Sequence, residues 1–148
     1  MAVGILYVDD EVHNLNGFKA TFRKEFEVFT AISAAEGRKI LDTHEIGVII
    51  TDQRMPVTTG IEFLESIIPY YPDTIRILLS GFSDINAVMD AINRGQVYKF
   101  VVKPWQNDEL KMYIQNAVEI YQLRKDNKQL ADKLKSAQAE LEDLKRLK

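Results

Sequence analysis

Short apolar runs alternate along the chain with segments whose apolar residues recur every three or four positions. Runs rich in β-branched residues, each of strand length, lie at 5–8, 28–31, 47–51, 75–79 and 98–102. Helical spacing of apolar residues follows each run. Because parallel strands need crossover connections, strict alternation of five strands with helices predicts one parallel sheet with helices on both faces. The expected fold is an α/β, doubly wound five-stranded parallel sheet.

Capping signals set the expected helix boundaries. We expect helices at 11–25, from 33 onward, at 60–68, at 84–94 and from 107 onward. The second helix opens with Ser33 and, three residues later, Glu36, which is the spacing of a capping box. The fourth ends at Gly95, a residue suited to a left-handed cap. The last helix meets neither Gly nor Pro up to residue 148.

Composition narrows the class of protein. A chain of 148 residues with 46% hydrophobic content supports one core, in a domain of about 100 to 150 residues. The chain has no cysteine, which excludes disulfides and thiolate metal sites. A net charge of -3 gives no overall attraction to nucleic acid or anionic membranes, and no apolar run reaches the about 18 residues of a membrane span. We therefore expect a cytoplasmic protein without a membrane span or a recognition helix for nucleic acid.

Polar residues stand at the carboxyl ends of four predicted strands. Asp9 and Asp10 follow the first strand, Asp52 the third, Ser80 the fourth and Lys103 the fifth. Ligands of doubly wound sheets bind beyond these ends. Three carboxylates gathered there would raise one another's pKa unless a cation joined them. An oxygen-only donor set without clustered His or Cys favours Mg²⁺ over zinc or a caged calcium ion.

The same residues suit phosphoryl transfer. With a divalent cation nearby, an aspartate such as Asp52 can attack phosphorus and form an acyl phosphate. A lysine, here Lys103, neutralises developing charge on the phosphoryl oxygens, and a hydroxyl, here Ser80, donates a hydrogen bond to them.

These segments resemble the receiver domains of two-component response regulators. The resemblance covers about residues 3–121 and rests on "ILYVDDE", "VIITDQRMPVTTGIEFL", "IRILLSG" and "YKFVVKPW". It implies a (βα)5 flavodoxin-like fold, a histidine kinase as phosphodonor and Mg²⁺ as cofactor. It also implies a phospho-accepting signalling domain that is not itself an enzyme, so that any output enzyme lies outside this chain.

The resemblance also assigns metal ligands and a phosphoryl acceptor. It implies that Asp52 accepts the phosphoryl group. Asp10 would bind Mg²⁺ directly and Asp9 through water, while Asp52 and the main-chain carbonyl of Arg54 complete the protein ligands.

The switch residues implied by the resemblance lie on the last two strands. Ser80 would be the switch hydroxyl and Phe100 the switch aromatic, while Lys103 would bind the phosphoryl group. The Lys103–Pro104 peptide bond is usually cis in this family, and proline makes that isomer accessible. Phosphorylation would then alter the face formed by the fourth helix and fifth strand.

Two further side chains bear on the lifetime of the phosphorylated state. In this family, the positions of Arg54 and Phe82 tend to set how fast the acyl phosphate hydrolyses. Neither side chain offers a group that activates water. We therefore expect a long-lived phosphorylated state.

The final segment has the heptad pattern of a coiled coil. Its seam places Ile120, Asn127, Leu134 and Leu141 at position a, and Leu123, Leu130, Ala137 and Leu144 at position d. The lone polar Asn127 favours a parallel, in-register dimer. Glu119 with Arg124, and Glu140 with Lys145, would pair across it. We expect a receiver domain at 1–121 and a coiled-coil extension of the fifth helix at 122–148, a linker to an absent output domain; the alternative is a solvated single helix.

Other functions remain open for the whole protein. The receiver can belong to a larger signalling enzyme with cyclic-dinucleotide turnover or phosphatase output, or the chain can act as a stand-alone coiled-coil adaptor. A metal-dependent phosphatase with an aspartate nucleophile is disfavoured, because Asp9, Asp10 and Glu11 lack the Asp-x-Asp spacing of those enzymes.

Overall fold

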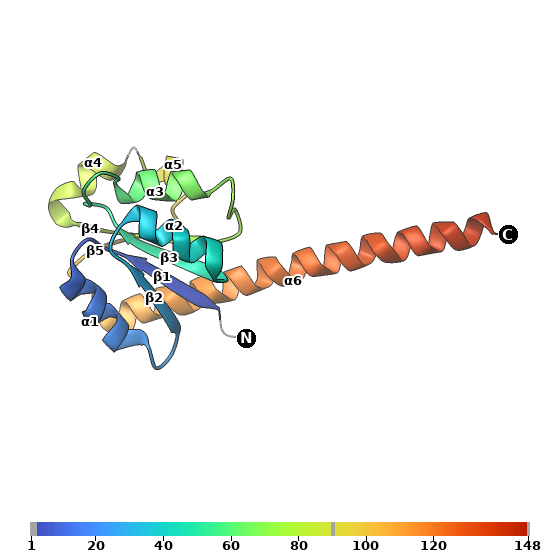
Figure 1. Cartoon of the computed structure of the whole chain (residues 1–148), viewed down its shortest axis with the longest axis horizontal. Coiled ribbons are helices and arrows are strands. Elements are labelled where there is room, and N and C mark those ends of the chain that lie inside the picture. Colours follow the sequence, from blue (N-terminus) through green and yellow to red (C-terminus); the bar gives the residue numbers. More distant parts are fainter. Residues whose placement is uncertain (1–2, 90, 148) are drawn as a thin grey trace.

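The computed structural model describes residues 3–89 and 91–147, and describes only the backbone of Phe82, Ala87 and Gly95. The elements are β1 (Gly4–Val8), α1 (Val12–Phe22), β2 (Glu27–Ala31), α2 (Ala34–Thr43), β3 (Ile46–Asp52), α3 (Gly60–Ile67), β4 (Ile75–Gly81), the 3-10 turn η1 (Phe82–Asp84), α4 (Ile85–Met89), α5 (Ile92–Gly95), β5 (Lys99–Lys103) and α6 (Asn107–Arg146). All strand pairs are parallel, in the order β2-β1-β3-β4-β5 (Figure 1). The predicted doubly wound fold is confirmed.

Helices cover both faces of the sheet and create two apolar layers (Figure 1). One layer joins strand residues to α1 and α6; there the Tyr7 ring stacks on Phe18 at 4.3 Å between centroids. The other layer packs α2 and α3 against the opposite face, with Phe63 and Leu64 almost fully buried. Successive strand residues point to opposite faces, so each strand supplies both layers.

The connection between β4 and β5 differs from the sequence prediction. In place of one helix over 84–94, the chain forms η1 and then two short helices, α4 and α5. Ala91 lies in a turn between the two short helices, and its amide donates to the Val88 carbonyl three residues back at 2.9 Å, a tighter bond than the four-residue step of an α-helix. The prediction that Gly95 forms the left-handed cap is also wrong, because Gln96 adopts positive φ, 47°.

The turn from β3 into α3 is set by a close backbone contact. The Gly60 amide donates to the Gln53 carbonyl at 3.1 Å, and a Cβ on Gly60 would lie 2.4 Å from the Asp52 carbonyl oxygen. Thr59 and Glu62 form a reciprocal capping box at the start of α3. Only glycine allows α3 to begin this near to the end of β3.

The last helix packs on the sheet at one end and leaves it at the other. Leu110, Ile114 and Ala117 of α6 are fully buried, whereas beyond Lys125 every described residue is exposed. Figure 1 shows this second part extending away from the rest of the molecule. The sequence correctly predicted one long helix here. None of the described helices has the length and apolar character that a membrane span requires.

Candidate functional site

Three carboxylates meet at the carboxyl end of the sheet. Asp9 and Asp10 follow β1, and Asp52 ends the neighbouring strand β3. One carboxylate oxygen from each lies within 4.8 Å of the others. Asp9 is 1% exposed and Asp52 7% exposed. Because buried like charges need a cation or a proton to coexist, this all-oxygen donor set fits a hard divalent ion such as Mg²⁺.

Asp9 is held by three hydrogen bonds. Its Oδ2 accepts from the Tyr7 hydroxyl at 2.7 Å and from Asn14 Nδ2 at 3.2 Å, and its Oδ1 accepts from the Glu11 amide at 3.0 Å. Burial, reinforced by the bond to Asp9, raises the pKa of Tyr7, which keeps the hydroxyl a donor. Tyr7 was not predicted as a site residue, although side chains two residues apart along an extended chain point to the same side.

Lys103 reaches the acidic cluster from β5. Its Nζ lies 2.6 Å from Asp52 Oδ1 and 3.9 Å from Asp9 Oδ2. Burial raises the pKa of Asp52, while the bond from Lys103 acts in the opposite direction and the charges of Asp9 and Asp10 add to the rise. The Lys103–Pro104 peptide bond is cis.

The Ser80 hydroxyl is buried next to this cluster and lacks a partner. Ser80 is 1% exposed, and its Oγ makes no hydrogen bond to any residue that the structure describes. In the ladder between β3 and β4, Asp52 pairs with Leu79, so Ser80 lies one residue farther along the neighbouring strand. An unsatisfied buried hydroxyl costs about 1 to 3 kcal/mol. Phe100 of β5 is half-buried and packs against the α2 and α3 layer.

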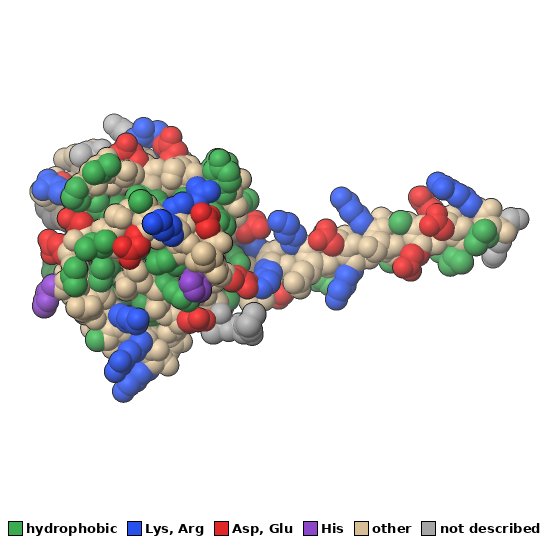
Figure 2. Space-filling view, viewed as in Figure 1, with side chains coloured by type: hydrophobic (Ala, Val, Ile, Leu, Met, Phe, Trp, Pro, Cys, Tyr) green, Lys and Arg blue, Asp and Glu red, His purple; other side chains and the backbone are tan. Residues whose placement is uncertain are grey.

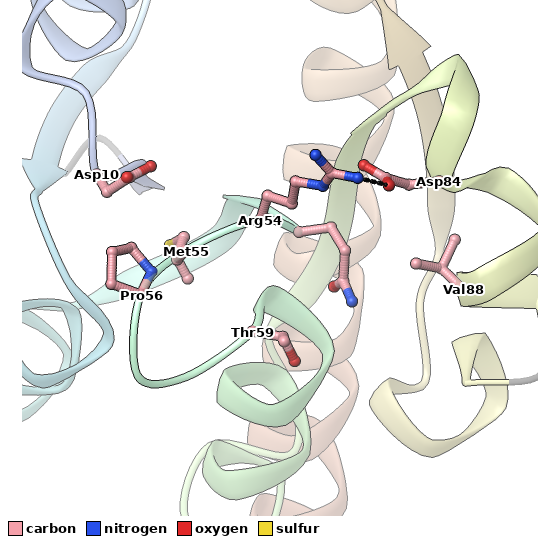
Figure 3. Close-up of a pocket in the computed structure, with 8 residues that line it drawn as sticks. Asp10, Arg54, Met55, Pro56, Thr59, Asp84 and Val88 are labelled. Atoms are coloured by element: carbon pink, nitrogen blue, oxygen red, sulfur yellow. Dashed lines mark hydrogen bonds and ion pairs between the residues drawn. The ribbon is translucent and has the colours of Figure 1, made fainter.

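A pocket of about 390 Å³ opens beside these residues, with Asp10, Arg54 and Asp84 in its lining (Figure 3). Across it, Arg54 Nη2 lies 2.7 Å from Asp84 Oδ1. The pair joins the loop after β3 to the turn after β4. Asp84 was not predicted as a site residue. The Phe82 side chain, which we associated with the lifetime of the phosphorylated state, lies outside the described residues.

Comparison with known proteins decides the family. Residues 5–115 match the family of the response regulator receiver domain. The chain belongs to this receiver family. It is 34% identical over 122 residues to the hydrogenase transcriptional regulatory protein HoxA of Bradyrhizobium diazoefficiens, an alignment covering 82% of this chain and 25% of HoxA. The chain thus spans about a quarter of this relative's length.

Solved structures agree with the receiver assignment. A response regulator receiver domain protein from Clostridium thermocellum superposes with a TM-score of 0.75 at 31% identity, covering 82% of this chain and 98% of that one. A structure described as adenylate cyclase from Rhodopirellula baltica gives a TM-score of 0.83 at 31% identity, covering 90% and 99%. The predictions of a receiver domain and a phospho-accepting response-regulator function are confirmed. Receiver domains in general take their phosphoryl group from histidine kinases and bind Mg²⁺ in an acidic pocket.

Proposed function

We propose that Asp52 accepts a phosphoryl group from a histidine kinase and that Ser80 and Lys103 then bind the phosphoryl oxygens. The buried, unpartnered Ser80 hydroxyl is the observation that carries this proposal. A phosphoryl group on Asp52 would supply the acceptor that the hydroxyl lacks, and the lysine 2.6 Å from Asp52 would supply a cation. The gain in bonding at Ser80 would favour movement of β4 and its following turn toward Asp52.

The transfer step follows from the positions of these groups. An Asp52 carboxylate oxygen attacks phosphorus, a new P–O bond forms, and the bond to the donor breaks with its electron pair leaving on the donor atom. Lys103 Nζ stays close to the oxygens that gain charge. When bound, Mg²⁺ would neutralise charge on the phosphoryl oxygens. Asp9, Asp10, Asp52 and the Arg54 carbonyl are the proposed ligands, with Asp9 acting through water.

The assignment is tested by incubating the protein with acetyl phosphate and Mg²⁺ and recording its intact mass. We expect one added phosphoryl group, its loss when Mg²⁺ is chelated, and its location on Asp52 by peptide mapping. Labelling that persists without a divalent ion, or that maps to a residue other than Asp52, would contradict the proposal.

Tyr7→Phe is expected to weaken Mg²⁺ binding about tenfold, since the hydroxyl fixes the orientation of Asp9 and such supporting bonds tune metal affinity. The fluorescence of Trp105, the chain's single tryptophan, reports binding because it lines a pocket with Lys103 and Asn14. Phe22→Tyr, which also changes one buried ring by a hydroxyl but does not contact Asp9, serves as control. Equal affinity of Tyr7→Phe and wild type would show that Asp9 needs no such support.

The Arg54–Asp84 pair is expected to prolong the phosphorylated state by covering the pocket above the acceptor. Asp84→Ala should shorten the half-life several-fold, because it releases Arg54 and admits water. The decay of labelled protein is followed by mass. If the two residues act as a pair, the double variant Arg54→Ala/Asp84→Ala should decay no faster than the faster single variant. Decay of the wild type within seconds would contradict the expectation of a long lifetime.

Phosphorylation is further proposed to change the face formed by the helices after β4 and by β5. Phe100 lies on β5 directly opposite Leu78 of β4 and is half-buried. A shift of Ser80 toward Asp52 would change the space available to the Phe100 ring. This is how Ser80 and Phe100 would act as a switch.

The extension of α6 is proposed to form a parallel coiled-coil homodimer, with the receiver ending near residue 121. Seam residues Leu123, Leu130, Leu134, Leu141 and Leu144 are each more than half exposed, and Figure 2 shows apolar patches among charged side chains along this part of the helix. Ile120, the first seam residue, is instead half-buried against the receiver core, so the free seam would begin at Leu123. A single solvated helix would leave these leucines in water.

Leu130→Asp is expected to weaken dimerisation on the order of a hundredfold, because a charge would be buried in the seam without a partner. Ala139→Asp adds the same charge at an outward position and is the matched control. Sedimentation equilibrium measures both. A monomeric wild type at tens of micromolar, unchanged by Asn127→Leu, would remove the coiled coil from the proposal.

We propose a cytoplasmic location for the protein and no direct contact of this chain with nucleic acid. The HoxA relative is named a transcriptional regulatory protein, and such matches do not favour a cyclic-dinucleotide enzyme, a phosphatase or a stand-alone adaptor as the whole protein.

A further inference from the structure

The amino-terminal edge of the sheet, opposite the acidic cluster, carries a second group of charged contacts. It lies where α6 leaves the rest of the molecule. Two loop carboxylates, Glu45 before β3 and Asp73 before β4, face the helix. Lys125 Nζ donates to Glu45 Oε1 at 2.5 Å, and the Tyr121 hydroxyl donates to the same oxygen at 3.3 Å. The Lys125 bond lowers the pKa of Glu45, so both groups are charged near neutral pH.

The loop that contains Asp73 makes a similar pair of contacts with α6, at helix residues three positions farther along the chain. Arg124 Nη1 donates to the Asp73 backbone carbonyl at 3.4 Å, and Lys128 Nζ lies 3.4 Å from Asp73 Oδ2. Each loop thus contacts two helix residues, in one case Tyr121 with Lys125 and in the other Arg124 with Lys128. Residues four apart lie on the same side of a helix. Two separate loops therefore contact α6 over neighbouring turns.

Both loops are held in place by the body of the domain. The Glu45 carbonyl accepts from the Gly4 amide at 3.3 Å. Next to Asp73, the buried Thr74 hydroxyl donates to the Tyr71 carbonyl at 2.8 Å. The Tyr121 ring also packs closely on β3, since a Cβ added to Gly47 would lie 2.6 Å from that ring.

We propose that these contacts form an exit clasp, a joint that fixes the direction in which α6 leaves the receiver. The exit clasp consists of Glu45, Asp73, Tyr121, Arg124, Lys125 and Lys128. Exposed ion pairs are individually weak. Here they flank a packed aromatic ring and act on one stiff helix, so small displacements of the helix axis would strain several contacts together.

The exit clasp leaves the seam of the proposed dimer free. At about 100° per residue, Lys125 and Lys128 lie on the side of α6 that faces the receiver, whereas Leu123 and Leu130 lie on a different side. A second copy can therefore pack on the seam while each receiver stays clasped to its own helix. Arg124 is the exception: we predicted that it pairs with Glu119 of a partner helix, but here it contacts Asp73. The exit clasp itself does not depend on the dimer.

Distances between spin labels test the exit clasp. Because the chain has no cysteine, Lys39→Cys on α2 and Ala139→Cys on α6 provide the only two labelling sites. An excess of unlabelled protein restricts the signal to pairs within one chain. We expect a narrow distance distribution in this background, and a distribution at least about twice as wide after Lys125→Ala/Lys128→Ala, whose alanines preserve helix propensity.

Two further variants make the result decisive. Lys133→Ala/Lys135→Ala removes the same charge from the same helix, where the described residues show no ion pair to the receiver, and should leave the distribution narrow. Glu45→Gln alters only the receiver side and should broaden it. A broad distribution in the starting protein, or equal widths in the clasp and control variants, would overturn the proposal. Circular dichroism checks that α6 remains helical in each variant.

Discussion

Asp52→Asn is expected to abolish labelling by acetyl phosphate, reducing it by on the order of a hundredfold or more because the amide is not a nucleophile toward phosphorus. The substitution should not lower the stability of the fold. Burial raises the pKa of Asp52, so folding makes ionisation of this carboxyl group less favourable than in the unfolded chain, and the ionised carboxylate costs stability as the pH rises above its ordinary pKa. Asparagine carries no charge. At pH 7 the variant's free energy of unfolding should therefore equal or exceed that of the wild type.

The pH dependence separates this explanation from a general effect of the substitution. The stability advantage of Asp52→Asn should shrink as the pH falls from above the raised pKa of Asp52 to the ordinary range of a carboxyl group, because the folded wild type takes up its proton first. Urea unfolding at several pH values measures it. Asp10→Asn serves as the comparison, since it keeps the acceptor. Full labelling of Asp52→Asn at a new residue, or an advantage that grows in acid, would contradict the assignment.

Gly60→Ala is expected to destabilise the fold by about 3 kcal/mol, because the added methyl group must displace backbone as well as side chains. The new Cβ would lie 2.4 Å from the Asp52 carbonyl oxygen and 2.9 Å from a Leu78 methyl carbon. Relieving the first contact moves the end of β3, which carries Asp52, the proposed acceptor. Phosphorylation should therefore slow in the fraction that still folds. Urea unfolding and the labelling rate measure the two effects.

Gly17→Ala is the matched control for this substitution. Gly17 lies inside α1, and a Cβ there meets nothing within 4 Å. Alanine should therefore stabilise the protein by about 0.5 to 1 kcal/mol through helix propensity. If Gly60→Ala did not lower the free energy of unfolding relative to Gly17→Ala, the close contact between position 60 and the end of β3 would not restrict the side chain there.

Much of the fold and site could be predicted because they depend on local patterns. Short apolar runs identified the strands, helical spacings identified most helices, and parallel topology brought Asp9, Asp52 and Lys103 to one edge of the sheet. Once strand order is known, residues at successive carboxyl ends become neighbours in space. The acidic cluster could therefore be located without any knowledge of distances.

The missed features depend on contacts between distant segments. The sequence pattern identified Tyr7 only as an apolar residue of the first strand, whereas in the structure its hydroxyl donates to Asp9. The sequence pattern placed Asp84 at the start of a helix. Its ion pair with Arg54 could not be predicted, because it depends on how two loops approach each other. The turn at Ala91 between α4 and α5 and the positive φ of Gln96 depend on local backbone bonds that a single periodic pattern does not reveal.

The apolar layer beneath α6 has one further consequence. Tyr7, whose hydroxyl holds Asp9, belongs to the same layer as Leu110 and Ile114 of α6, and its ring stacks on Phe18 of α1. The residues on which α6 packs and the tyrosine that orients Asp9 thus belong to one apolar cluster. A substitution in this layer, unlike one at Ser80, is therefore expected to disturb both the packing of α6 and the orientation of Asp9.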